Sequence, residues 1–113
     1  MINDQVYATH LIMKFDPSRE ISNDQALAII RDIVEDGILI LSHHAKERMA
    51  ERGYTLYDVV HILLHGRIVG KEHKEKTNNW SYKIHGNDLE NDEGTVVIAI
   101  LKQMSAIVIT VLG

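Results

Sequence analysis

Apolar residues recur at a helical spacing in the first third of the chain. Between Ser22, a good N-cap residue, and Gly37, apolar side chains follow the i, i+3, i+4, i+7 spacing of one helix face. They are Ala26, Ile29, Ile30 and Ile33. The pattern predicts a helix over residues 23–36 that glycine ends. The first 20 residues mix apolar and polar groups up to a break at Pro17, and we expect a short strand or an arm there.

Capping residues indicate two further helices. Ser42 precedes a segment that we expect to be helical over residues 43–52, up to a glycine. Thr55, with Asp58 three residues later, has the spacing of a capping box. This spacing predicts a third helix that ends at His65-Gly66, where glycine can take the left-handed conformation.

Strand patterns occupy the rest of the chain. A four-residue apolar run at residues 38–41 suits a short buried strand. Four longer strands are predicted at residues 67–72, 80–85, 95–101 and 106–112. The joins between these four are short enough for hairpins, so we expect an antiparallel meander, with its most apolar strand near the centre. The predicted fold class is therefore α+β, with two to three helices packed on a four-stranded antiparallel sheet.

The length and composition exclude several classes of protein. A chain of 113 residues has room for a single domain, in which residues 1–37 would form an N-terminal extension with one helix and residues 38–113 a core. A large multi-domain enzyme is excluded. The chain has no cysteine, which excludes disulfides, thiolate metal sites and a cysteine nucleophile, and favours the cytoplasm. No apolar run approaches the roughly 20 residues of a membrane span.

Charge is distributed unevenly along the chain. The formal net charge is -4, yet residues 43–83 hold eight basic and five acidic side chains, and five of the seven histidines. Residues 1–42 hold three basic and seven acidic side chains, and residues 84–113 one and four. A nucleic-acid partner would therefore dock on the middle segment. An ordinary fluctuation of composition is the alternative explanation.

Three basic side chains of the second predicted helix share one face. His44, Arg48 and Arg52 are spaced i, i+4, i+8. Cleavage of a phosphodiester without a metal needs a base, a proton for the leaving oxygen and fixed positive charge on the transition state, and this row supplies those groups. The alternative is a solvated face with weak ion pairs, because Glu47 and Glu51 alternate with the arginines.

The same stretch resembles a family of small bacterial domains of unknown function with the signature S-x-H-A-x-x-R-M-x-x-R-G. The signature is complete here as Ser42, His44, Ala45, Arg48, Met49, Arg52 and Gly53. Residues 82–88, read as "Y-K-v-x-G-x-D", the apolar strand at 96–99 and the closing "I-T-V" at 109–111 are also similar to the family, so the likeness runs from about residue 38 to 112.

The resemblance implies a fold related to the RelE-like ribonuclease toxins and a toxin-like role in bacteria. We therefore expect RNA cleavage or RNA binding without a metal or other cofactor, with His44, Arg48 and Arg52 as catalytic residues. Residues on the sheet also act in such folds, which makes Tyr82, Lys83 and His85 candidate substrate contacts. Lys46, on the signature helix, is a further candidate.

Other interpretations stay open at this point. The protein could be a non-catalytic interaction module, of the antitoxin, immunity or inhibitor kind, that binds a basic protein through Asp88, Glu90, Asp92 and Glu93. The acidic residues 1–37 could cover the basic segment, form a homodimer face, or complete the core. His61 and His65 are spaced i, i+4, but no third ligand accompanies them, so we expect no metal site. The hairpin arm at residues 71–76 could touch a phosphate backbone, and Trp80 could stack a base or belong to the core.

Overall fold

The computed structural model describes residues 15–113, so the strand or arm expected at the N-terminus falls mostly outside the described residues. The elements, in chain order, are α2 (Asn23–Asp36), β1 (Ile38–Leu41), α3 (His43–Arg52), α4 (Leu56–His65), β2 (Arg67–Lys74), β3 (Asn79–Asn87), β4 (Glu93–Lys102) and β5 (Ser105–Leu112). The α+β class and all three helices agree with the expectation from the sequence.

Each helix begins at the capping residue that the sequence indicates. Ser22 accepts a hydrogen bond from the Gln25 amide at 3.1 Å, and Thr55 accepts one from the Asp58 amide at 3.3 Å, both within complete capping boxes. At the end of α3, Gly53 adopts φ +70°, the left-handed conformation that glycine takes without steric cost. No helix within residues 15–113 is long and apolar enough to cross a membrane.

The sheet has five strands and is mixed, which corrects the expectation of four antiparallel strands. Its order is β1-β5-β4-β3-β2. Strands β2 to β5 form the expected antiparallel meander, with the apolar β4 in the centre. Strand β1 adds to the outer edge of β5 in parallel, with Ile38 opposite Ser105 and Leu41 opposite Val108. The unpaired edge of β5 would otherwise leave amide and carbonyl groups without partners, and the short apolar run satisfies them.

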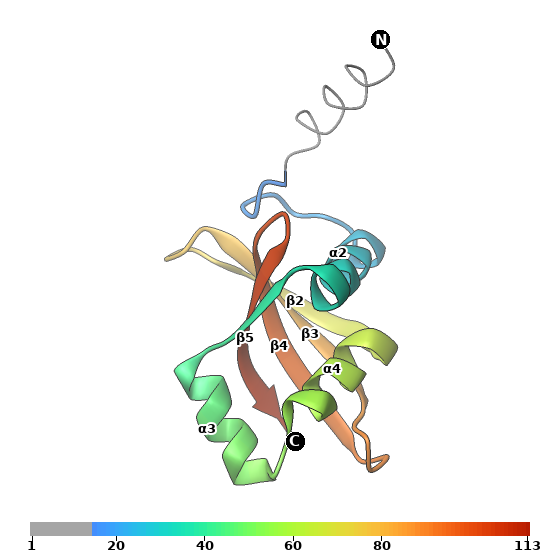
Figure 1. Cartoon of the computed structure of the whole chain (residues 1–113). Coiled ribbons are helices and arrows are strands. Elements are labelled where there is room, and N and C mark those ends of the chain that lie inside the picture. The colour runs from blue at the N-terminus through green and yellow to red at the C-terminus, as the bar shows by residue number, and fades with distance from the viewer. Residues whose placement is uncertain (1–14) are drawn as a thin grey trace.

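One face of the sheet carries the helices and the hydrophobic core. Figure 1 shows α2 and α4 lying across this face and α3 beside the end of β5. The core of side chains is almost wholly buried and includes Ile30, Ile62, Ile84, Ile98 and Val108. Because side chains alternate along a strand, residues such as Lys83, His85 and Thr95 point to the opposite face. That second face, which we call the open face, has no described helix on it.

Helix α2 is part of the core. Ala26, Ile30 and Ile33 are fully buried, and Arg31 donates to the Gly66 carbonyl oxygen at 2.8 Å. The helix packs against α4 and against β1, β2 and β5. The segment before it is tied to β2 and β3, where the Trp80 indole donates to the Ser18 carbonyl at 3.2 Å. Three roles were open for residues 1–37, and the burial of α2 agrees with the third, completion of the core.

Two glycines allow the end of α4 to approach β3 closely. A Cβ atom at Gly66 would lie 2.6 Å from the carbonyl oxygens of His85 and Ile62, and one at Gly86 would lie 2.9 Å from the Gly66 Cα. Any larger residue would push α4 away from the sheet. This contact fixes α4 over β3 and so sets the position of the loop between β3 and β4.

Candidate functional site

Ser42 fixes the start of the signature helix on the sheet. Its hydroxyl accepts from the Ala45 amide at 3.0 Å and donates to the Ile109 carbonyl oxygen at 2.9 Å. Its own amide donates to the Val108 carbonyl oxygen at 3.0 Å. The Ser42 side chain therefore both caps α3 and binds it to β5. These two hydrogen bonds fix the position of the first turn of α3.

Three other signature residues also serve the fold. Ala45 and Met49 are buried, one turn apart, and form the face by which α3 packs beside β5. Gly53 then ends the helix, so that the Tyr54 amide can donate to the Met49 carbonyl oxygen at 2.8 Å. With Ser42, four of the seven signature residues have a structural role that can be named.

The remaining three, His44, Arg48 and Arg52, form one row on α3, as predicted. His44 and Arg52 are exposed, and 35% of the Arg48 side chain is accessible. Arg48 makes an ion pair with Glu51 at 3.2 Å, and the neighbouring His43 makes one with Glu47 at 2.7 Å. The His44 ring has no hydrogen-bond or ion-pair partner within residues 15–113. The expected weak ion pairs exist, but they leave the imidazole and the arginine row accessible.

Arg52 lines an acidic cleft. Its guanidinium carbon is 5.8 Å from the centre of the Tyr54 ring and packs against Gly113, at the end of β5. The cleft has a volume of about 400 Å³ between the end of α3, the start of α4 and the loop from β3 to β4. Its acidic lining residues are Glu51, Asp58, Asp88, Glu90, Asp92 and Glu93. Arg52 therefore faces carboxylates on one side and the signature row on the other.

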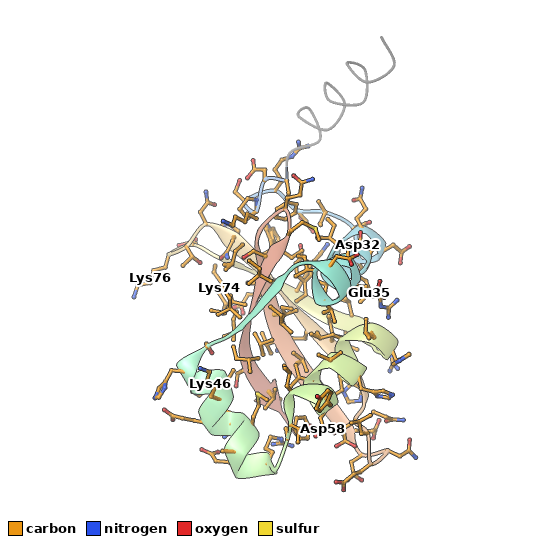
Figure 2. The ribbon with its side chains drawn as sticks, viewed as in Figure 1. Asp32, Glu35, Lys46, Asp58, Lys74 and Lys76 are labelled. Carbon is orange, nitrogen blue, oxygen red and sulfur yellow. The ribbon has the colours of Figure 1, made fainter. Side chains whose placement is uncertain are left out.

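Asp58 also lines this cleft, and Figure 2 shows it at the start of α4. One carboxylate oxygen accepts from the Thr55 amide at 2.8 Å and the other from the Leu89 amide at 3.1 Å. The hydrogen bonds from Thr55 and Leu89 lower the pKa of Asp58, although burial opposes them. Asp88 accepts from the amides of Glu90 and Asp92 in the same loop, at 2.8 and 3.0 Å. Both carboxylates thus shape the loop.

The candidate residues on β3 separate onto the two faces of the sheet. Lys83 is exposed and His85 half-buried, both on the open face. Tyr82 points the other way and is only 1% exposed, inside the core, where burial raises its pKa. A substrate cannot reach Tyr82 in this structure, and we therefore assign it to the core. Strand alternation, which was visible in the sequence, separates it from its two neighbours.

Lys46 is exposed on α3 but does not join the signature row. It is two residues from His44, which corresponds to about 200° around a helix of 3.6 residues per turn. Figure 2 shows it on the upper part of α3. Lys46 therefore projects away from the face that His44, Arg48 and Arg52 share.

A comparison with protein families identifies the signature segment. The family described as "Domain of unknown function (DUF4258)" matches residues 41–112. The chain belongs to this family. The matched segment begins immediately before Ser42 and ends with β5, so it contains the signature row and the open-face residues, while α2 lies outside it. No curated protein matches the chain, and no solved structure matches it either.

The sequence reasoning missed several partners within the DUF4258 segment. His85 contacts Thr95 and Glu93 on β4, and Arg67 lies opposite His85 on β2. The signal was present, because a hairpin centred near residue 90 pairs His85 with Thr95. Tyr54, the aromatic partner of Arg52, directly follows the signature in the sequence.

The histidines of α4 are close but do not form a larger cluster. The ring centres of His61 and His65 are 4.6 Å apart, and His61 Nδ1 contacts the Asn87 carbonyl oxygen at 2.8 Å. Within the described part of this DUF4258 chain, no three His, Asp or Glu side chains gather closely enough to hold a metal ion.

Proposed function

We propose that this protein binds single-stranded RNA through the His44, Arg48 and Arg52 row and cleaves it without a metal ion. The observation that carries the proposal is that the signature residues of α3 fall into two groups, one that stabilises the fold and one that is accessible to solvent. Ser42, Ala45, Met49 and Gly53 serve the fold, whereas the imidazole and the two guanidiniums extend to solvent on one side. A fold that needs only the first four leaves the other three available for a ligand.

The row supplies the groups that such a reaction needs. In the proposed step, the His44 imidazole takes the proton of a ribose 2'-hydroxyl while its oxygen attacks the adjacent phosphorus. The bond from phosphorus to the 5'-oxygen breaks, and that oxygen takes up a proton from the imidazolium or from water. The products are a 2',3'-cyclic phosphate and a 5'-hydroxyl. Arg48 and Arg52 would hold the phosphate and stabilise its extra negative charge.

The carboxylates around the row do not prevent phosphate binding. The Arg48–Glu51 and His43–Glu47 pairs join solvent-exposed side chains, and such pairs contribute little free energy. A phosphate that accepts two hydrogen bonds from a guanidinium can displace a single carboxylate contact. The carboxylates of the acidic cleft beyond Arg52 would then repel RNA from the cleft itself and favour a path over the end of β5.

The resemblance to RelE-like ribonuclease toxins also favours this proposal. That resemblance implies two helices followed by a four-stranded antiparallel meander, and α3, α4 and β2 to β5 occur here in that order. Because the order of helices and strands is the one that the resemblance implies, cleavage of RNA should be tested as well as binding.

RNA binding and cleavage in the presence of EDTA test the proposal. We expect wild-type protein to bind a short unstructured RNA with an affinity that falls as salt rises, and to cut it to cyclic-phosphate ends. His44→Ala should abolish cleavage and Arg48→Ala should weaken binding. His43→Ala is the control for His44→Ala, because it removes another exposed imidazole outside the row. Lys102→Ala is the control for Arg48→Ala, because it removes another positive charge outside the row. Absence of RNA binding by the folded wild type would overturn the proposal.

Growth on induction gives the same test inside the cell. We expect growth arrest with fragmented RNA on inducing wild type in bacteria, and normal growth with His44→Ala. Circular dichroism of both proteins establishes that they are folded. Normal growth and intact RNA with abundant folded wild type would contradict a toxin-like role.

A second candidate function is binding of a basic protein at the acidic cleft. The observation that favours it is a pair of exposed apolar side chains whose chain neighbours line the cleft. Tyr57 is 74% and Leu89 is 58% exposed, and Leu89 is tied to Asp58, the first-turn residue of α4 next to Tyr57. Apolar side chains beside a charged cleft are typical of a protein contact. In that case Glu90→Lys would abolish partner capture and Arg48→Ala would not.

A further inference from the structure

The open face of the sheet has a row of side chains in register at one end. Arg67, His85, Thr95 and Leu112 lie opposite one another on β2, β3, β4 and β5. Gly113, next to Leu112, is the residue against which the Arg52 guanidinium packs. Strands are about 4.8 Å apart, so the row spans about 15 Å from β5 to β2. Its β5 end therefore adjoins Arg52, the last residue of the signature row.

Two cations on this face form no direct ion pair in the described residues, although the charge of Lys83 helps to lower the pKa of the nearby Glu72 carboxyl. Arg67 and Lys83 make no ion pair within residues 15–113. The two nearby carboxylates are already occupied, since Glu72 pairs with Lys74 at 2.9 Å and Glu93 contacts His85 at 3.1 Å. This part of the surface thus presents two cations that no carboxylate contacts directly, although the whole chain carries -4.

His85 is held at both ring nitrogens. Nδ1 lies 2.9 Å from the Thr95 hydroxyl oxygen, and Nε2 lies 3.1 Å from a Glu93 carboxylate oxygen. An ionised carboxylate only accepts, so Nε2 donates, and a neutral ring then accepts the Thr95 proton at Nδ1. Glu93 is 78% exposed, so its contact is weak and another oxyanion can replace it.

A hollow of about 350 Å³ adjoins Lys83 on the same face. It is lined by Val69, Gly70, Lys71, Glu72, Ser81 and Lys83. Gly70 leaves the space open, because a Cβ atom there would meet only the Lys83 side chain, at an ordinary 3.7 Å. The backbone does not require glycine at this position, so the hollow can be filled without strain.

We propose that Arg67, Lys83 and His85 form a second phosphate site, on the open face, which binds a further phosphate of the same RNA strand. This inference rests on the proposed function and extends it, since the strand would run from α3 across β5 and β4 to β3 and β2. Arg67 and Lys83 supply charge-assisted hydrogen bonds, and the phosphate replaces Glu93 at His85 Nε2. The hollow at Gly70 accommodates the sugar or base beside that phosphate.

An amide NMR titration of the full chain with a short unstructured RNA tests the two sites separately. We expect shifts at residues 44, 48 and 52 on α3 and at residues 67, 83 and 85 on the sheet. The variant Arg67→Ala/Lys83→Ala should lose the sheet shifts, keep those on α3, and bind the RNA at least about tenfold more weakly. Lys76→Ala/Lys102→Ala removes the same charge elsewhere and should change little.

A gain of affinity gives a second, independent test. Glu93→Gln removes the carboxylate that competes for His85 and should tighten RNA binding several-fold. Glu90→Gln removes one charge from the same loop without touching His85, and should have a smaller effect. Gly70→Leu should weaken binding by filling the hollow while leaving thermal stability nearly unchanged.

Each outcome of the titration decides between the two proposals. Shifts on α3 alone would overturn the second site and support the function proposed for the signature row. Shifts on the sheet alone would support a phosphate site on the open face and refute the α3 site. Absence of shifts at both places with folded wild type would overturn both. Equal effects of Glu93→Gln and Glu90→Gln would refute the competition at His85.

Discussion

Helices α3 and α4 have the same length but differ in how much of their surface is buried in the core. Each has ten residues, begins at a Ser or Thr cap and ends at a glycine. Helix α4 buries Asp58, Val59, Ile62 and Leu63 beneath itself, whereas α3 buries only Ala45 and Met49. Most of the α3 surface therefore makes no contact on which folding depends.

The difference separates the effects that substitutions should have. A change on the inner face of α4 should lower the free energy of unfolding, because burial of apolar surface is the main stabilising term. A change in the outer row of α3 should alter ligand binding and leave stability intact. If both helices responded alike, the assignment of the α3 row to function would lose its physical basis.

Truncation in α4 should have the largest effect on stability. Ile62 is fully buried and reaches Gly94 on β4. Ile62→Ala should lower the free energy of unfolding by about 2–5 kcal/mol, from lost burial and the cavity left behind. Urea unfolding measures it, with His44→Ala on α3 as the control that should change little. If Ile62→Ala lowered the free energy of unfolding as little as the control does, burial of α4 would not be a main source of stability.

Asp58 should give the next largest effect. Asp58→Ala removes the capping-box partner of Thr55 and leaves the Leu89 amide without an acceptor, at a cost of about 2 kcal/mol. Asp58→Asn keeps an acceptor oxygen and should lose less. Because the pKa of Asp58 is lowered in the folded state, its ionised form stabilises the fold above the unfolded value of about 3.9.

The pH dependence of this effect has a defined sign. The stability that Asp58 contributes should be fully present at neutral pH and should be lost as pH falls below about 4, through the lowered pKa. The difference in urea midpoint between wild type and Asp58→Asn should therefore narrow in acid. A difference that stayed constant or widened there would contradict the hydrogen-bonded carboxylate.

Ser42 tests how α3 is anchored. Ser42→Ala removes the cap and the bond to the Ile109 carbonyl, and should cost about 1–2 kcal/mol. Ser22→Ala on α2 is a matched control, because Ser22 caps its helix in an exposed place and should cost about 0.5–1 kcal/mol. Thermal unfolding of both variants measures the difference. Equal losses would show that the bond to β5 adds nothing.

Most of the local structure could be predicted from the sequence, because its causes are local. The caps Ser22, Ser42 and Thr55 and the stop at Gly53 define the helix ends within a few residues. The meander followed from strand patterns and short joins. The row on α3 followed from its i, i+4, i+8 spacing, which any helix converts into one face.

Contacts between distant segments could not be predicted in the same way. The pairing of β1 with β5 joins residues that are 67 apart in the chain. No local sequence pattern shows whether the short run at 38–41 pairs with the sheet or stays outside it. The acidic cleft beside Arg52 forms where the start of α4 meets the β3–β4 loop, at the hydrogen bond from the Leu89 amide to Asp58. Tyr82 was misplaced for a different reason, since the resemblance suggested a role that strand alternation excludes.

Substitution of Arg48 should have the smallest effect on stability, and this result would be the most informative. Arg48 contacts Glu51 through a partly exposed ion pair, so Arg48→Ala should change the free energy of unfolding by less than about 0.5 kcal/mol. The same change should weaken RNA binding about tenfold or more if the guanidinium holds a phosphate. Arg48→Lys keeps the charge but not the paired donors, and should recover only part of the affinity. Combining urea unfolding with RNA titration separates the outcomes, because a large loss of stability would mean that Arg48 serves the fold after all.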